Sequence, residues 1–271
     1  MSMNVTSQTD KSRDAKPSTG GRDSACVACG GTGWLIETQG TIEKARRCDC
    51  VSRRIMEKLI SNAGIPQRYS DCCIDTLNAK GNDSLRAAKK VAQKFIDDYP
   101  AVTAGLLFIG PPGVGKTHLA VAILKEIVHK TGDTCIFYDY RDVLKQIQET
   151  YNKESQASEM AILEPVLTCR LLVLDEIGAR RVTDWAHDTI FYILNQRYSN
   201  SRITIMTSNF PESKLSYDKA MQTHRDLDEY TLVDRIGIRL DSRLHEMCRF
   251  VRIEGEDYRK RNIQERYGST G

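Results

Sequence analysis

Hydrophobic residues in this chain gather in short unbroken runs, and the stretches between the runs show helical spacing. A continuous apolar run of this length, bounded by turn residues, is typical of a buried strand. Such runs predict strands at Leu106–Ile109, at Cys135–Tyr138 and at Leu171–Glu176, which ends in two carboxylates, and two further strands are predicted at the apolar-rich stretches Arg202–Met206 and Met247–Ile253. The pattern therefore predicts an α/β protein in which strands and helices alternate.

The stretches around these runs predict helices. Ser84–Tyr99 is amphipathic, and its apolar side carries Leu85, Ala88, Val91, Ala92, Phe95 and Ile96. Further helices are predicted at His118–Thr131, Tyr140–Tyr151, Met160–Leu167 and Trp185–Tyr198. By contrast, Asn152–Ser158 contains no core-building residue, and we expect a mobile loop there.

A connecting helix is predicted at Val51–Ala63. Its apolar residues at helical spacing are Val51, Ile55, Leu59 and Ile60, and Gly64 with Pro66 ends it. Basic residues face away from this stripe, and we favour a solvated surface over a nucleic-acid contact for Arg53, Arg54 and Lys58. Gly64–Tyr69 is predicted to be extended. The polar segments Met1–Ser24 and 262–271 are expected to be disordered or frayed.

Composition restricts the class of protein. The 271 residues suit one large domain or two modest ones, and the net charge of +3 is too small to prove a nucleic-acid partner. No apolar run approaches the ~20 residues that span a bilayer, and the first residues lack the apolar core of a signal peptide. Nine cysteines without such a signal indicate a reducing compartment. We therefore expect a cytoplasmic protein without a membrane partner.

Four of the cysteines form two close pairs, Cys26 with Cys29 and Cys48 with Cys50. Four thiolates can surround one Zn²⁺ tetrahedrally, and with every position filled by protein the ion would be structural. A small hairpin between Trp34–Ile36 and Thr41–Ile42 could hold the pairs together. The alternative is four unrelated thiols, perhaps redox-active. The other cysteines, Cys72, Cys73, Cys135, Cys169 and Cys248, are interpreted as packing residues.

The segment from Gly110 to Thr117 reads Gly-Pro-Pro-Gly-Val-Gly-Lys-Thr, between a predicted strand and a predicted helix. This is the G-x-x-x-x-G-K-[ST] pattern, whose backbone N–H groups surround a phosphate at a helix N-terminus. Lys116 can reach the β- and γ-phosphates, and the Thr117 hydroxyl can ligate Mg²⁺. We prefer this interpretation to a glycine-rich turn without a ligand, because every fixed position is present.

Two further strand ends carry polar residues. Asp175 and Glu176 follow the run Leu171–Leu174, where Asp175 can hold Mg²⁺ beside Thr117 and Glu176 can polarise the attacking water. The next strand ends in Thr-Ser-Asn, and Asn209 could help to position that water. An ordinary acidic strand end is the alternative for the first pair.

Arginines recur in the last part of the chain. Arg239 and Arg243 lie one helical turn apart and therefore share a face. One of them could reach the γ-phosphate of a neighbouring subunit as an arginine finger. The alternative is a surface helix with salt bridges.

The order of these motifs resembles a known family. GPPGVGKTHLA, LLVLDEIG, ITIMTSN, RLDSRL and GEDYR occur in sequence, and GIPQRY precedes them. Together they resemble the DnaC/DnaI-type bacterial helicase loaders and the related IstB transposase helpers, which are AAA+ ATPases. The resemblance covers Cys26 to Arg259.

The resemblance implies a fold and a set of roles. The expected fold is an AAA+ P-loop ATPase core with a parallel central sheet flanked by helices, no C-terminal lid domain and an N-terminal four-cysteine zinc module. Asn209 matches sensor 1, and Arg243 matches the arginine finger, with Arg239 as a second candidate. The implied nucleotide-binding residues are Gly110, Pro111, Pro112, Gly113, Val114, Gly115, Lys116, Thr117, His118 and Asp175.

The implied function is ATP-dependent loading of the hexameric replicative helicase onto single-stranded DNA, with nucleotide state controlling self-association through the ATPase interface. The expected divisions are a tail at 1–24, a helicase-docking module at 25–75, the ATPase at 76–261 and a tail at 262–271. The first alternative is an IstB-like ATPase that assists a transposase, and the separate cysteine module favours the loader. The second is a nucleotide-gated DNA-binding module without turnover, against which Glu176 argues.

Overall fold

The computed structural model describes residues 26–39, 42–151, 158–179, 183–212 and 230–260. The expected tails Met1–Ser24 and 262–271, and all but the last residue of the loop Asn152–Ser158, lie outside these ranges. The chain divides into two compact units, one up to Arg53 and one from Arg54 onwards. This division falls earlier than the boundary at residue 75 that the sequence suggested.

The larger unit is built on a five-stranded parallel sheet with the order β4-β5-β6-β3-β7. The strands are β3 (Gly105–Ile109), β4 (Cys135–Asp139), β5 (Leu171–Asp175), β6 (Ile203–Ser208) and β7 (Cys248–Arg252). Each predicted run is therefore confirmed as a strand within one or two residues at its ends. Because the strands are parallel, all their carboxyl ends meet at one edge of the sheet.

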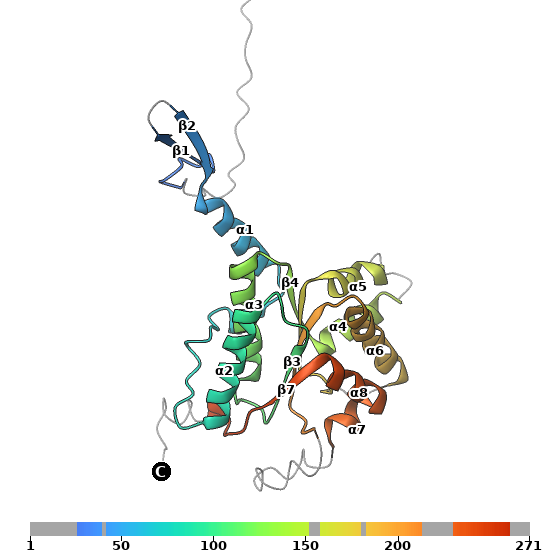
Figure 1. The fold of residues 1–271 in the computed structure, drawn as a ribbon. Helices are drawn as coiled ribbons and strands as arrows, with labels where there is room; N and C mark the ends of the chain where they lie inside the picture. The colour runs from blue at the N-terminus through green and yellow to red at the C-terminus, as the bar shows by residue number, and fades with distance from the viewer. Residues whose placement is uncertain (1–25, 40–41, 152–157, 180–182, 213–229, 261–271) are drawn as a thin grey trace, which may run out of the picture. The chain divides into compact units, whose positions relative to one another are not determined.

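Helices cover both faces of this sheet (Figure 1). One face packs against α2 (Asp83–Asp98) and α3 (Lys116–Thr131). The other carries α4 (Tyr140–Glu149), α5 (Glu159–Thr168), α6 (Asp184–Ser199), α7 (Leu232–Ile236) and α8 (Ile238–Met247). The two covered faces explain why the strands read as continuous apolar runs.

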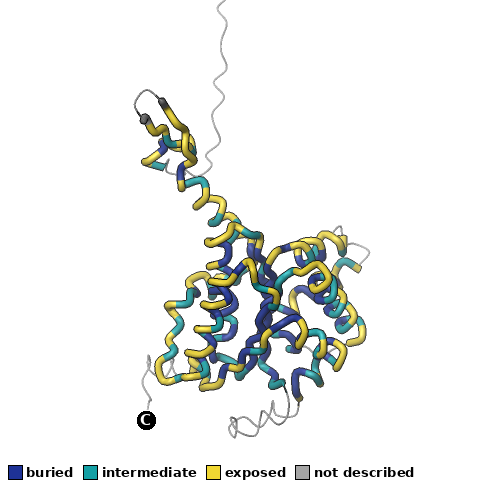
Figure 2. Tube along the Cα trace, viewed as in Figure 1, coloured by how far each residue is buried: buried dark blue, intermediate teal, exposed yellow. Residues whose placement is uncertain are grey.

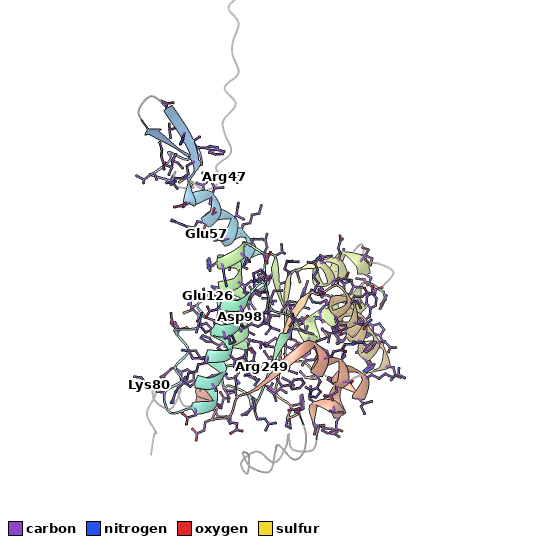
Figure 3. The ribbon with its side chains drawn as sticks, viewed as in Figure 1. Arg47, Glu57, Lys80, Asp98, Glu126 and Arg249 are labelled. Atoms are coloured by element: carbon purple, nitrogen blue, oxygen red, sulfur yellow. The ribbon has the colours of Figure 1, made fainter. Side chains whose placement is uncertain are left out.

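Alternate residues of each strand enter different cores. In β3, Leu106 and Phe108 belong to the core under α2 and α3, whereas Leu107 and Ile109 belong to the core on the opposite face. The buried segments concentrate along the sheet in Figure 2. Charged side chains such as Asp98 of α2 and Glu126 of α3 remain exposed on the outside (Figure 3). The sheet is thus packed against helices on both of its faces.

Sequence periodicity did not predict α7. This five-residue helix begins with a capping box in which Thr231 and Asp234 satisfy each other's backbone N–H groups, and it ends at Gly237. A helix this short has too few residues to produce a recognisable apolar stripe. The expected helix around Arg239 and Arg243 is confirmed as α8.

The smaller unit contains an antiparallel hairpin of β1 (Trp34–Gln39) and β2 (Ile42–Arg47), and α1 (Asp49–Ser61) begins within it. The hairpin confirms the predicted one and extends it. Helix α1 starts two residues earlier than predicted, so that Cys50 lies inside it. The predicted apolar stripe of α1 is not fully buried, since Ile55 is 51% exposed.

The segment after α1 differs from its prediction. Gly64–Tyr69 was expected to be extended, but Gln67–Tyr69 forms a single 3₁₀ turn, η1. The Tyr69 N–H donates to the Pro66 carbonyl, and the following turn closes from Cys72 back to Tyr69. Within the described residues, no helix is both long enough and apolar enough to cross a bilayer.

Candidate functional site

The loop between β3 and α3 encloses a lysine. Gly115 caps α3 in the left-handed conformation, and the helix begins directly with Lys116. Lys116 is 5% exposed, and its ammonium donates to the carbonyl oxygens of Gly110 and Pro111, each at 2.7 Å. Burial is the main cause that lowers the pKa of Lys116 to about 8. The loop therefore holds one cation at the N-terminus of a long helix, an arrangement suited to phosphate.

Asp175 lies against this loop. Its Oδ1 accepts hydrogen bonds from the hydroxyls of Thr117, at 2.9 Å, and Thr207, at 2.6 Å. The carboxylate is 2% exposed, and burial raises its pKa despite both hydrogen bonds. An oxygen pair from Thr117 and Asp175 fits the preference of Mg²⁺ for one or two protein ligands beside substrate phosphates.

Glu176 points to a different set of partners. Its backbone has φ +58°, and its N–H donates to the Thr207 hydroxyl at 2.9 Å. Its Oε2 is 3.0 Å from the Arg141 guanidinium, which also contacts Asp139 at 2.9 Å. The Glu176 side chain is about one third exposed, so solvent can reach it. Thr207, which the sequence analysis gave no role, thus fixes Asp175 and the backbone of Glu176 at once.

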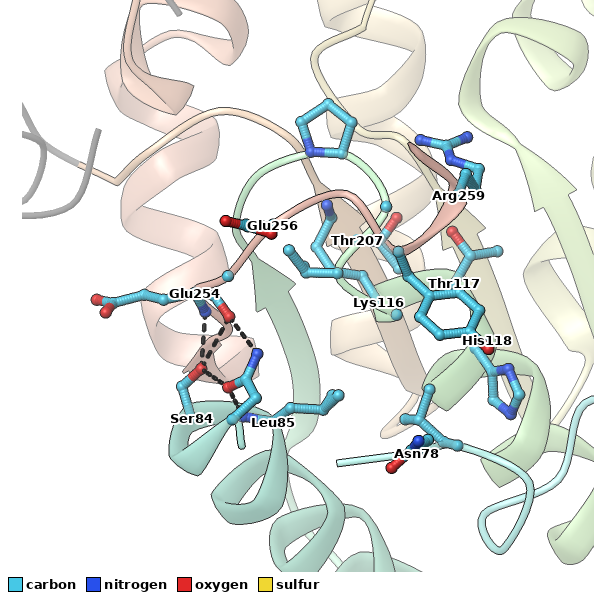
Figure 4. Close-up of a pocket in the computed structure, with 18 of the residues that line it drawn as sticks. Asn78, Ser84, Leu85, Lys116, Thr117, His118, Thr207, Glu254, Glu256 and Arg259 are labelled. Atoms are coloured by element: carbon cyan, nitrogen blue, oxygen red, sulfur yellow. Dashed lines mark hydrogen bonds between the residues drawn. The ribbon is translucent and has the colours of Figure 1, made fainter. Parts of the chain in front are cut away.

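Lys116, Thr117, Glu176 and Thr207 line one pocket with a volume of about 800 Å³, a size suited to a nucleotide, and Asp175 lies directly behind Thr117 and Thr207. The wall includes four of the residues named in the sequence analysis, Lys116, Thr117, Glu176 and Asn209. The close-up view shows Lys116, Thr117 and Thr207 gathered at the pocket (Figure 4). His118 lines it too, but its Nε2 lies 2.8 Å from the Cys73 carbonyl oxygen.

Another wall comes from the chain after β7. The Asn82 side chain caps α2 and donates to the Glu254 carbonyl at 2.7 Å, and the Glu254 N–H donates to Ser84 at 2.8 Å (Figure 4). These hydrogen bonds connect the first turn of α2 to the segment that follows β7. The wall they form was not foreseen from the sequence.

This wall brings a second cation to the pocket. The Tyr258 N–H donates to the Gly113 carbonyl at 3.2 Å, and Arg259 lines the pocket. Asp257 accepts from the Arg259 Nε at 3.1 Å, and its Oδ1 would lie 1.8 Å from a Cβ on Gly113. Gly113 has φ +78°, so both its conformation and this close approach require glycine. The GEDYR residues that carried the resemblance therefore supply part of the site.

The two candidate arginine fingers lie elsewhere. Among the described residues that line the pocket, neither Arg239 nor Arg243 occurs. Arg239 is exposed on α8, and Arg243 contacts Glu246 at 2.7 Å and stacks over Tyr198 at 4.6 Å. These side chains do not meet the phosphate loop of their own chain.

The four predicted zinc ligands come together in the smaller unit. Their sulfur atoms all lie within 4.8 Å of one another, with Cys26 and Cys48 3.8 Å apart and Cys29 and Cys50 3.5 Å apart. A tetrahedron of Zn–S bonds of about 2.3 Å has sulfur separations of about 3.8 Å. The Gly33 N–H donates to the Cys29 sulfur at 3.3 Å and is the main cause that lowers the pKa of Cys29 to about 6. The cluster therefore fits a tetrahedral cation.

Comparisons with known proteins agree with this geometry. The profile of a family described as IstB-like ATP binding protein matches residues 34–266. YqaM, an uncharacterized protein of Bacillus subtilis, is 26% identical over 78% of this chain and 64% of its own length. The replicative helicase loader DnaC of Escherichia coli K12 is 27% identical over 57% of this chain and 62% of its own length. This chain thus spans a little under two thirds of these relatives.

A solved structure gives a more complete match. The crystal structure of the DnaC helicase loader superposes with a TM-score of 0.58 and 32% identity, over 70% of this chain and the whole of that one. The aligned part of the molecule thus shares its fold and nearly a third of its residues with that loader.

Proposed function

Because the chain belongs to the IstB-like ATP binding protein family and is a DnaC-type AAA+ protein, we propose that it is an ATP-dependent loader of a replicative DNA helicase. The observation that carries the proposal is the 32% identity to the DnaC helicase loader structure along its whole length. The pocket at the sheet edge supports it, because it joins a phosphate loop to the Glu176 carboxylate, with Asp175 hydrogen-bonded to Thr117 of the same loop. We propose ATP hydrolysis as the reaction at this pocket.

The roles in hydrolysis follow from the contacts. Lys116 and the loop amides bind the phosphates, and the Arg259 guanidinium adds positive charge at the same pocket. Mg²⁺ held by Thr117 and Asp175 would neutralise phosphate charge. The Thr117 hydroxyl bonds to Asp175, whereas the Glu176 side chain is partly exposed to solvent. Glu176 therefore orients and deprotonates the water. Asn209, at the neighbouring strand end, helps to position it.

Self-association is the proposed role of α8. Neither Arg239 nor Arg243 lines the pocket of its own chain, as is expected of a residue that completes a neighbour's site. We propose Arg243 as the finger, with Arg239 as the second candidate. In the neighbouring site, such an arginine would stabilise charge on the transferred phosphoryl group.

The cysteine unit is proposed to hold one structural Zn²⁺ and to dock on the helicase. Elemental analysis should find about one Zn²⁺ per chain, and chelation should change the circular dichroism of the hairpin. Cys48→Ser should lose the ion, whereas Cys73→Ser, outside the cluster, should keep it. A metal-free protein whose spectrum is unchanged by chelation would contradict the zinc assignment.

The loader proposal predicts a nucleotide-dependent complex. The protein should co-purify with the replicative helicase of its own organism, and the yield should differ between ATP and ADP. Single-stranded DNA should then be retained by the complex in the ATP state. Recovery of a transposase in place of the helicase would favour the IstB-like alternative and overturn this proposal.

A further inference from the structure

The segment between α1 and α2, residues 63–77, is fixed to the ATPase unit by a series of polar contacts. We call it the connecting segment. The Phe137 N–H of β4 donates to the Ala63 carbonyl at 2.7 Å. Gly64 has φ +73°, and a Cβ there would lie 2.9 Å from the Phe137 carbonyl oxygen. Its first residues therefore pack directly on the sheet, with room for glycine alone.

Two side chains of α3 hold the rest of the segment. Lys125 donates to the carbonyl oxygens of Ser70, at 2.6 Å, and Cys72, at 3.0 Å. His118 Nε2 lies 2.8 Å from the Cys73 carbonyl oxygen. His118 and Lys125 are seven residues apart and so share one face of α3. The helix that starts at the phosphate loop is thus also the support of the connecting segment.

At the turn η1 the connecting segment reaches the pocket. Tyr69 lines it together with Lys116, Thr117 and Glu176. The Tyr69 ring lies 6.4 Å from the Phe137 ring, and the Arg68 guanidinium lies 4.7 Å above the Tyr69 ring. Both contacts involve the aromatic ring of Tyr69, and neither involves its hydroxyl group.

Tyr69 shares this pocket with Lys116, Thr117 and Glu176, the residues that we propose to meet the phosphates, Mg²⁺ and the water. A tyrosine hydroxyl is protonated at neutral pH and can donate one hydrogen bond. A packing role against Phe137 requires the ring alone. The hydroxyl has no part in that packing.

We propose that Tyr69 is a positioning residue for ATP hydrolysis, whose hydroxyl donates a hydrogen bond to the γ-phosphate in the pocket that Tyr69 lines with Lys116 and Thr117. Through Tyr69, the triphosphate also restrains the connecting segment, which lies within the larger unit between α1 and α2. This inference rests on the proposed ATP hydrolysis but not on the identity of the helicase.

The test compares two tyrosines that differ in location. Tyr69→Phe keeps the ring on Phe137 and removes the hydroxyl. Tyr99→Phe removes a hydroxyl that donates to Asp133 at 2.8 Å and does not line the pocket. We expect Tyr69→Phe to lower kcat about three- to tenfold, with the Kd for ATP within about twofold, as for one lost hydrogen bond. Tyr99→Phe should leave kcat unchanged.

Hydrogen exchange of the wild-type protein provides a second measurement. A non-hydrolysable ATP analogue should slow exchange of the amides at residues 67–73, and ADP should slow them less. Equal kcat in Tyr69→Phe and wild type would overturn the inference. Equal exchange rates at residues 67–73 with the ATP analogue and with ADP would overturn it as well. Both assays omit the helicase. Failure of the helicase to bind would therefore refute the loader proposal and leave this inference standing.

Discussion

Replacement of Lys116 by alanine is expected to weaken ATP binding at least about 100-fold, because charge-assisted hydrogen bonds to the phosphates are lost. The Lys116 ammonium is almost completely buried and already bonds two carbonyl oxygens of its own loop. In a buried site of this kind, a single positive charge contributes far more than it would in water. Titration with a fluorescent ATP analogue measures the effect directly.

Lys130→Ala provides a matched control at the other end of the same helix. The Lys130 ammonium also donates to two carbonyl oxygens, those of Ile96 at 2.6 Å and Asp97 at 2.7 Å. It does not line the pocket, so its loss should leave ATP affinity unchanged. If Lys116→Ala bound ATP within a few-fold of the wild type, the assignment of the phosphate site would be wrong.

The low pKa of Lys116 adds a pH dependence to the same binding reaction. Burial lowers that pKa to about 8, whereas bound phosphates would favour the charged form and raise it. The complex then binds more protons than the free protein above pH 8, so ATP affinity should fall as pH rises through about 8. Lys116→Ala should lack this component.

Lys116→Ala also tests Arg243. In a mixture of Lys116→Ala and Arg243→Ala chains, the first supplies intact arginines and the second intact phosphate loops. Turnover in the mixture above that of either variant alone would place Arg243 in a neighbouring subunit's site. Without such a gain, the pair formed by Arg243 with Glu246 would be a surface salt bridge only.

Local sequence patterns were sufficient for the strands and for the phosphate loop. Each strand is rich in apolar residues that pack on both faces of the sheet, and the spacing from Gly110 to Thr117 is fixed by the loop itself. Asp175 could be placed beside Thr117 because parallel strands end at one edge. The contact of 2.9 Å between them agrees with that expectation.

Contacts between distant segments were not predictable in this way. Arg259 reaches the pocket because β7 pairs with β3, so that the chain after β7 emerges beside the phosphate loop. The order of strands in the sheet decides this, and no local pattern encodes it. Tyr69 lies in the site for a similar reason, since α3 side chains hold a segment about 50 residues earlier in the chain.

Arg197 shows the same limit inside the core. The helical pattern placed it on α6, but its complete burial was not expected of a charged residue. Its guanidinium donates to the backbone carbonyls of Val166, Cys169 and Ile203. Those carbonyls belong to the end of α5 and the start of β6, and only their meeting in three dimensions provides enough acceptors.

Glu176→Gln is expected to retain ATP binding and to lower kcat at least about 100-fold, the contribution of a general base. The amide keeps the shape of the side chain but cannot accept a proton from water. Asp175, Thr117 and Thr207 keep their mutual hydrogen bonds, so the nucleotide-binding side of the pocket stays intact. Single-turnover assays with saturating ATP separate the chemical step from binding.

Arg141→Gln distinguishes this role from a structural one. Arg141 lies 3.0 Å from Glu176 and 2.9 Å from Asp139, so Glu176→Gln also breaks an ion pair. A half-exposed pair of this kind contributes little, and its loss should change kcat by less than about fivefold. If Arg141→Gln were as inactive as Glu176→Gln, the Glu176 carboxylate would act through its ion pair with Arg141 and not as a general base. If both variants were as active as the wild type, the water would have to be activated by another group.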